Sequence, residues 1–155
     1  MQLTRFTDYA LRILIYLGKN SDRLVTIREI AEVHKLFENH LVKIVHKLAK
    51  LGYIETVRGK GGGMRLARRP DLISLGEVVR DTEGNMDIAE CFGVGAVSCT
   101  LLPSCTLKSV LIAAKKNFLG TLDLYALSDL IGTQPGTATL AETSKLTSAI
   151  KVTQR

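Results

Sequence analysis

The chain has 155 residues, a formal net charge of +6 and three cysteines. It holds no apolar run of membrane length and no secretory or lipidation signal at its start, and an odd number of cysteines argues against a disulfide framework. We therefore expect a cytoplasmic protein of one or two small domains with no membrane partner.

Positive charge is concentrated in the first half of the chain. Residues 1–70 hold 14 Lys and Arg against 6 Asp and Glu, whereas residues 71–155 hold 7 against 9. A basic half beside a nearly neutral one indicates a nucleic-acid partner, although a merely soluble surface can produce the same asymmetry.

The first predicted helix begins at Thr7, whose hydroxyl can cap it, and ends at Gly18, a residue type that readily takes the left-handed conformation of a helix stop. Asp8 falls in the first turn, where the helix dipole favours a carboxylate. The apolar positions follow helical spacing: Ala10, Ile13, Leu14 and Leu17.

A pair of short helices follows. Thr26 and Glu29 form a capping-box pattern that opens the first, and the second is predicted from about Glu38 to Leu51. Beside its apolar stripe, the second helix carries Asn39, His40, Lys43, His46, Lys47 and Lys50. Two helices joined by a tight turn, the second basic on its open face, are typical of a helix-turn-helix, although an ordinary helical hairpin has the same pattern.

A β-hairpin is predicted directly after these helices. Residues 53–58 alternate like a strand, residues 64–67 can return antiparallel to them, and the glycine-rich residues 59–63 join the two. Such a hairpin is a wing, whose glycines allow its tip to approach a DNA backbone closely. The glycines precede no helix, which disfavours a nucleotide-binding loop. The candidate DNA-contacting residues are Arg28, Asn39, His40, Lys43, Lys47, Arg58, Lys60 and Arg65.

All three cysteines fall in one short segment, with the spacing Cys91-x7-Cys99-x5-Cys105. The glycines and the proline of this segment predict a loop. Thiolates gathered on one loop suit a soft metal or an iron–sulfur cluster, because a loop can wrap several sulfurs around one centre. The alternative is that the three thiols are incidental, either buried or reactive, because a full set of four ligands is missing.

After the cysteines, apolar residues at alternating three- and four-residue steps predict a helix over residues 107–131. They are Leu107, Val110, Leu111, Ala114, Phe118, Leu122 and Tyr125. So long a helix on a small domain is expected to pair with its twin in a two-fold homodimer, with packing back on the wing domain as the alternative. The Thr-, Ser- and Ala-rich residues 132–155 are expected to be disordered.

Several segments together resemble the iron–sulfur winged-helix transcription repressors, the family that includes IscR and NsrR. These segments are MQLTRFTDYALR at 1–12, HLVKIV at 40–45, GYI at 52–54, VRGKGGGMRL at 57–66 and the cysteine triplet. The resemblance covers about residues 1–131 and is closest to the nitric-oxide-sensing, NsrR-like branch.

The sequence pattern and this resemblance together predict a mostly α-helical fold in four parts. A winged helix-turn-helix DNA-binding domain (1–70) is followed by a connector with the cluster-binding cysteine loop (71–106), a dimerisation helix (107–131) and the tail (132–155). The helix that begins near Glu38 would enter the major groove, and Arg58 the minor groove.

The resemblance also implies a homodimer in which each subunit holds an iron–sulfur cluster on Cys91, Cys99 and Cys105, with 4Fe–4S favoured over 2Fe–2S. Asp8 matches an aspartate of the family's N-terminal motif that reaches the cluster of the opposite subunit, so it is the candidate fourth ligand. Alternatively, the Asp8 carboxylate only stabilises the N-terminus of its own helix through the helix dipole.

Three positions depart from the family pattern. The gap between Cys91 and Cys99 is wider than in relatives, and Phe37 stands where relatives carry a serine that caps the recognition helix. Lys108 replaces a histidine that serves as a ligand in the cluster-homeostasis branch, which favours the nitric-oxide-sensing branch.

The sequence therefore predicts a nitric-oxide-sensitive transcription repressor, not an enzyme, whose affinity for double-stranded operator DNA depends on the cluster. A regulator of cluster homeostasis or redox state on the same fold is the second hypothesis. A small iron–sulfur electron carrier is the third, and the basic winged half would have no purpose in it.

Overall fold

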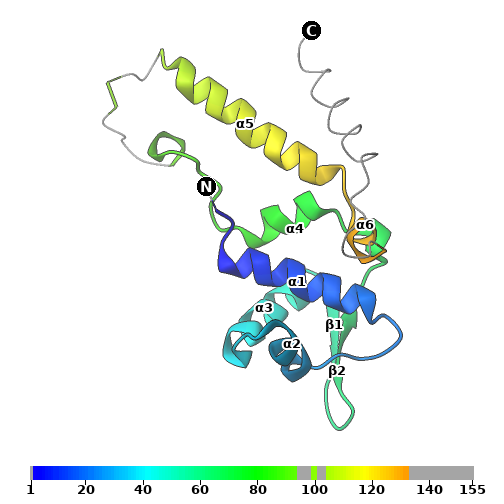
Figure 1. Cartoon of the computed structure of the whole chain (residues 1–155). Coiled ribbons are helices and arrows are strands. Elements are labelled where there is room, and N and C mark those ends of the chain that lie inside the picture. Colours follow the sequence, from blue (N-terminus) through cyan, green and yellow to red (C-terminus); the bar gives the residue numbers. More distant parts are fainter. Residues whose placement is uncertain (1, 94–98, 101–103, 133–155) are drawn as a thin grey trace.

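The computed structural model describes residues 2–93, 99–100 and 104–132. Figure 1 shows α1 at the centre, with α2, α3 and the hairpin on one side and α4 and α5 on the other. No helix in this part of the chain is long and apolar enough to cross a membrane. In chain order the elements are α1 (Arg5–Lys19), α2 (Ile27–His34), α3 (Glu38–Lys50), β1 (Ile54–Val57), β2 (Gly63–Leu66), η1 (Pro70–Leu72), α4 (Leu75–Thr82), η2 (Glu90–Phe92), α5 (Thr106–Asp123) and α6 (Leu127–Ile131).

The predicted winged helix-turn-helix fold is confirmed, and α1 is its central element. The predicted apolar face of α1 is buried, and it contacts α3, β2, α4 and α6. Each fully buried Leu or Ile side chain contributes about 1.5–3 kcal/mol, so this one face stabilises the domain substantially. The core around it contains Val25, Ile30, Leu41, Ile44, Leu48, Tyr53, Ile54, Met64, Ile73, Val78 and Leu127.

Both predicted ends of α1 are wrong. The N-cap is Thr4, whose hydroxyl accepts a hydrogen bond from the backbone N–H of Thr7 at 3.3 Å, while Thr7 itself is a buried residue inside the helix. Gly18 does not stop the helix, which continues to Lys19. A Cβ on Gly18 would lie 2.2 Å from Cδ1 of Ile131, so this glycine admits α6 rather than ending α1.

The wing is a two-stranded antiparallel sheet in which Ile54 pairs with Leu66 and Val57 pairs with Gly63. An isolated antiparallel bridge from Val25 to Met64 ties the wing to the segment just before α2. A Cβ on Gly63 would lie 2.8 Å from the carbonyl oxygen of Val25, so this close approach requires a glycine. The segment before α2 therefore holds β2 close to the turn of the hairpin, and residues 58–62 form the tip beyond this contact.

The single helix predicted for residues 107–131 is divided in two. The backbone N–H groups of Leu75 and Leu127 donate to the carbonyl oxygens of Tyr125 and Ile73, at 3.0 and 2.8 Å. These bonds belong to a short antiparallel pairing that pulls the chain out of helical geometry between α5 and α6. α5 therefore contains the predicted stripe only as far as Leu122, and α6 packs back on α1.

The C-terminal end of α5 is fixed to α4. A Cβ on Gly76 would lie 2.0 Å from a carboxylate oxygen of Asp123, and the same carboxylate pairs with Arg80. The close approach of α4 and α5 thus depends on the missing side chain of Gly76. The predicted tail lies outside the described residues beyond Gly132.

Candidate nucleic-acid interface and cysteine segment

The second helix of the helix-turn-helix, α3, has one buried and one open face. Leu41, Ile44, Val45 and Leu48 are buried, at the spacing that the sequence predicted. The opposite face is exposed and carries the predicted polar set: Asn39, His40, Lys43, His46, Lys47 and Lys50. A helix that is held by its apolar stripe and basic on its open face has the form of a DNA recognition helix.

The predicted DNA-contacting cations fall into two groups. Among the described residues, the side chains of Lys43, Lys47, Arg58 and Lys60 make no hydrogen bond or ion pair. Arg28 pairs with Glu32 at 3.0 Å, and Arg65 pairs with Glu55 across the wing. Such exposed pairs contribute only about 0–1 kcal/mol, so a phosphate can displace them, but the four unpaired cations can bind phosphates without that cost.

The tip of the wing is shaped by glycines. Gly59 and Gly61 have positive φ angles of 99° and 77°, a conformation that glycine adopts without strain. A Cβ on Gly62 would lie 2.3 Å from the carbonyl oxygen of Val57. The tight turn therefore presents Arg58 and Lys60 at an exposed, narrow end, as a minor-groove or phosphate contact requires.

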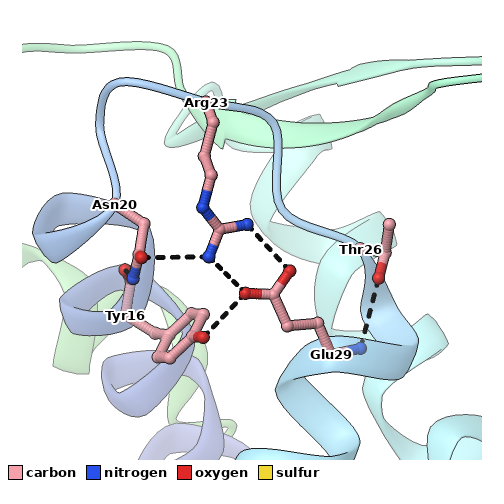
Figure 2. A network of polar contacts seen from close by, with 5 residues as sticks. All are labelled: Tyr16, Asn20, Arg23, Thr26 and Glu29. Carbon is pink, nitrogen blue, oxygen red and sulfur yellow. Dashed lines mark hydrogen bonds and ion pairs between the residues drawn. The ribbon is translucent and has the colours of Figure 1, made fainter.

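A polar network joins α1 to α2, as Figure 2 shows. Glu29 accepts hydrogen bonds from the Tyr16 hydroxyl at 2.7 Å and from Nη1 of Arg23 at 2.9 Å, while Thr26 caps α2 through the Glu29 N–H at 3.2 Å. Arg23 also donates to the side-chain oxygen of Asn20 at 3.0 Å. The bonds from Arg23 and then Tyr16 lower the pKa of Glu29 to about 2. The ionised carboxylate thus fixes the first helix of the helix-turn-helix against α1.

This network predicts a pH-dependent stability difference. Because the pKa of Glu29 is lowered from 4.5 to about 2, its ionised form stabilises the fold above about pH 4.5, and this stabilisation is lost as the pH falls towards about 2. We expect Glu29→Gln to lower the unfolding midpoint at neutral pH and to match the parent near pH ~2. Thermal unfolding followed by circular dichroism checks this, with Glu32→Gln, from the exposed pair with Arg28, as the matched control. A midpoint difference that is independent of pH would contradict the assignment.

Arg68 connects the end of α3 to α4. Its guanidinium donates to the carbonyl oxygens of Leu51 and Gly52 at 3.0 and 3.1 Å and to the carboxylate of Glu77 at 3.1 Å. The carbonyls at a helix C-terminus have no partner within the helix, so a cation there satisfies them and complements the dipole. One side chain therefore caps the recognition helix and ties it to α4.

Tyr53 makes a second connection at the same place. Its ring is fully buried under the Arg68 guanidinium, 4.6 Å from the ring centroid, and its hydroxyl donates to Asp81 of α4 at 2.7 Å. Burial and the Asp81 hydrogen bond raise the pKa of Tyr53, so the hydroxyl stays protonated and remains a donor. Tyr53 thus connects α4 to the residues that directly follow α3.

Asp8 lies in the first turn of α1, as predicted, and its carboxylate is paired with Arg12. The two oxygens receive Nε at 3.0 Å and Nη2 at 2.9 Å. Both side chains are nearly half exposed, so the pair is accessible from outside the subunit. Burial and the nearby Arg12 charge lower the pKa of His34, at the end of α2, and the opposing effect of Asp8 is smaller.

The three cysteines are free, partly exposed thiols. Cys91 lies on η2, and Cys105 is the N-cap of α5, with no side-chain capping bond. Lys115 of α5 ties the η2 end of the segment to that helix through Asp87 at 3.8 Å and the ring of Phe92 at 5.7 Å.

The donor set fits a thiolate-bound group. Three free thiols on a segment whose two ends are held to one helix are suitable soft ligands. Among the described residues, however, no group of three or more His, Cys, Asp or Glu side chains is gathered as a metal site. Residues 94–98 and 101–103, which separate the thiols, lie outside the described part of the chain.

Sequence reasoning missed the residues that position the interface. They are Tyr16, Asn20, Arg23, Tyr53 and Arg68. Each acts through a partner between 3 and 28 positions away in the chain. Their local sequence carries no signal for these contacts, because no helical or strand periodicity relates the partners.

Known proteins of similar sequence are HTH-type transcriptional regulators. The chain is 48% identical over 135 residues to the HTH-type transcriptional regulator NsrR of Bacillus licheniformis, covering 86% of this chain and 94% of the relative. It is 46% identical over 132 residues to the regulator of the same name from Bacillus subtilis, covering 84% and 90%.

Solved structures extend the likeness to the fold. CymR, the global cysteine regulator of B. subtilis, has a TM-score of 0.70 at 26% identity and covers 86% of this chain and 99% of its own. T. potens IscR has a TM-score of 0.69 at 25% identity, covering 92% and 96%. The family model described as iron-dependent transcriptional regulator, Rrf2, matches residues 3–133. The chain belongs to the Rrf2 family of transcriptional regulators.

Proposed function

We propose that this chain is a homodimeric transcription repressor of the cytoplasm whose affinity for operator DNA depends on an iron–sulfur cluster and whose signal is nitric oxide. The observation that carries the proposal is the placement of all three free thiols on a segment fixed to α5, next to a winged helix-turn-helix in which four of the predicted DNA-contacting cations are unpaired. The relatives named NsrR support the choice of signal.

On the DNA, α3 lies in the major groove and the wing tip lies over the adjacent minor groove. Lys43 and Lys47 bind phosphates beside the groove, and Arg58 enters the narrow minor groove. Asn39 and His40, in the first turn of α3, are placed to contact base edges, because recognition helices use their N-terminal residues for this purpose. Two subunits then bind half-sites about 34–36 Å apart.

The homodimer is formed by α5. None of its residues is buried, and Leu107 and Val110, three positions apart on one face of the helix, are more than half exposed. Exposed large apolar side chains on one face mark an interaction surface, and a second copy of the same helix is a self-complementary partner for it. This exposed face supports dimerisation along α5, with α6 holding the other end of the chain to the winged domain.

Cys91, Cys99 and Cys105 are the thiolate ligands, and Asp8 of the opposite subunit is the fourth. When bound, the cluster supplies thiolate-ligated iron with which nitric oxide reacts. Cys105 lies at the N-terminus of α5, where the helix dipole favours negative charge. The ligand residues then connect α5, through α4, to the Arg68 and Tyr53 contacts at the end of α3. A coupling of about 1–3 kcal/mol along this route changes operator affinity about 5- to 150-fold.

The test compares operator binding by the anaerobically purified full-length protein before and after cluster removal. We expect the cluster-containing form to bind about 5- to 150-fold more tightly and to lose this advantage on exposure to nitric oxide. Equal affinity of the two forms would contradict cluster dependence. A response to peroxide or iron limitation instead of nitric oxide would favour the regulator of redox state or cluster homeostasis.

Asp8→Ala provides a separate prediction. Loss of one carboxylate ligand leaves three thiolates, so we expect near-normal iron content but a changed rate of nitrosylation and weaker operator binding. Stopped-flow absorbance and gel shift measure the two effects. Asp71→Ala, which removes the carboxylate of an exposed ion pair with Arg69 away from α3 and the wing, controls for the loss of such a pair. Unchanged nitrosylation together with unchanged affinity would leave Asp8 as a residue of the helix N-terminus alone.

A further inference from the structure

The start of the recognition helix carries an apolar side chain that folding does not use. Phe37, the N-cap of α3, is 78% exposed, more than any other large hydrophobic side chain of the described residues. Its neighbour Leu36 packs against the core that contains Leu41 and thereby takes the inward position before the helix. Phe37 is therefore directed outwards by the chain geometry.

Phe37 is also a poor choice for the helix itself. Its side chain makes no capping hydrogen bond, whereas Ser, Thr, Asp or Asn at this position typically stabilises a helix by about 1 kcal/mol. The ring leaves a large apolar area exposed to solvent and provides no such capping hydrogen bond. A residue that contributes neither to the core nor to the cap is best explained by a contact made outside the subunit.

The surroundings of the ring indicate the chemistry of that contact. His40, one turn along α3, lies edge-on to Phe37 with centroids 6.0 Å apart at 75°, which holds the ring along the first turn of the helix. Asn39 and Lys43 are exposed nearby on the same helix. The ring thus lies among the side chains that face DNA in the proposed docking.

The major groove offers one apolar group, the C5-methyl of thymine. We propose that Phe37 packs on a thymine methyl in each operator half-site and that His40 supports the ring in this position. The contact makes Phe37 a specificity-determining residue. This inference rests on the proposed docking of α3 in the major groove.

Replacing thymine by uracil removes only the methyl and keeps every hydrogen-bonding group of the base. The cluster-containing full-length protein first selects a duplex from a random-sequence DNA pool, and each thymine of that duplex is then replaced singly by uracil. At one thymine per half-site we expect about a fourfold loss of affinity, the equivalent of ~0.8 kcal/mol for one buried carbon. Replacement in both half-sites should cost about 16-fold if the two contacts are independent.

Phe37→Ser is the decisive variant, because it removes the ring while supplying a helix cap. We expect it to unfold at the same or a higher temperature than the parent, to bind the selected duplex less tightly, and to be indifferent to uracil at the sensitive position. Thermal unfolding and fluorescence anisotropy on the two duplexes measure these effects.

Two outcomes would overturn the inference while leaving DNA binding intact. In one, the parent binds every uracil duplex as tightly as the thymine duplex. In the other, replacing thymine by uracil lowers the affinity of Phe37→Ser as much as it lowers that of the parent. Recognition of the methyl would then depend on another residue or on the shape of the DNA. Failure to enrich any duplex would overturn both the docking and the Phe37 contact.

Discussion

Alanine at Cys91, Cys99 or Cys105, one position at a time, is expected to abolish the coloured cluster while leaving the chain folded and dimeric. The cluster should be lost because two thiolates and a carboxylate are too few soft ligands to retain it. The fold should persist because none of the three cysteines is buried, and none belongs to the hydrophobic core. Absorbance with iron and sulfide analysis measures the cluster, and sedimentation with thermal unfolding measures the protein.

Ser104→Ala is the matched control, since it changes an exposed residue of the same segment that is not a predicted ligand. It should retain iron at the parent level. Full iron content in Cys91→Ala would show that the wide gap to Cys99 removes Cys91 from the ligand set. Unfolding of all three variants would instead assign the cysteines a structural role.

Arg58→Ala and Lys43→Ala are expected to weaken operator binding in different ways. Loss of a charged hydrogen-bonding side chain costs about 1.5–3 kcal/mol, so we expect about a 10- to 150-fold loss for Arg58→Ala, largest on A·T-rich duplexes with a narrow minor groove. Lys43→Ala should weaken binding to all sequences alike and reduce the salt dependence by about one unit of slope for each lost phosphate contact. Titrations at several salt concentrations separate the two effects.

Each control variant also removes one positive charge, so its net charge equals that of Arg58→Ala and Lys43→Ala. Arg69→Ala removes a cation beside η1 that pairs with Asp71, and Lys116→Ala removes an exposed cation of α5. Neither lies on α3 or the wing, so each should bind the operator almost as the parent does. Normal binding by Arg58→Ala with its cluster intact would show that the wing tip does not enter the groove.

The local pattern of the sequence determined most of the winged fold. Apolar periodicity placed the buried faces of α1 and α3, because burial of a helix requires one stripe at helical spacing. Thr26 was identified as a cap, because a cap depends on residues three positions apart. The glycines at 59–63 located the wing tip, since positive φ angles require them there.

Contacts between distant segments decided what the sequence left open. Gly18 has the residue type of a helix stop, but its surroundings, set by Ile131, make it a packing site. The helix predicted for residues 107–131 extends past α5, but the pairing of Tyr125 with Leu75 ends α5 before Leu124. A local pattern cannot register such partners, because they are brought together only when the chain has folded.

The same distinction holds for the candidate interface. The sequence identified the basic face of α3 and the wing cations, since exposure and charge follow from pattern and composition. Only the tertiary structure showed which of these cations are already paired, that Arg68 caps α3, and that Phe37 remains outside the core. These properties depend on which side chains approach one another across the fold, and sequence spacing does not encode that proximity.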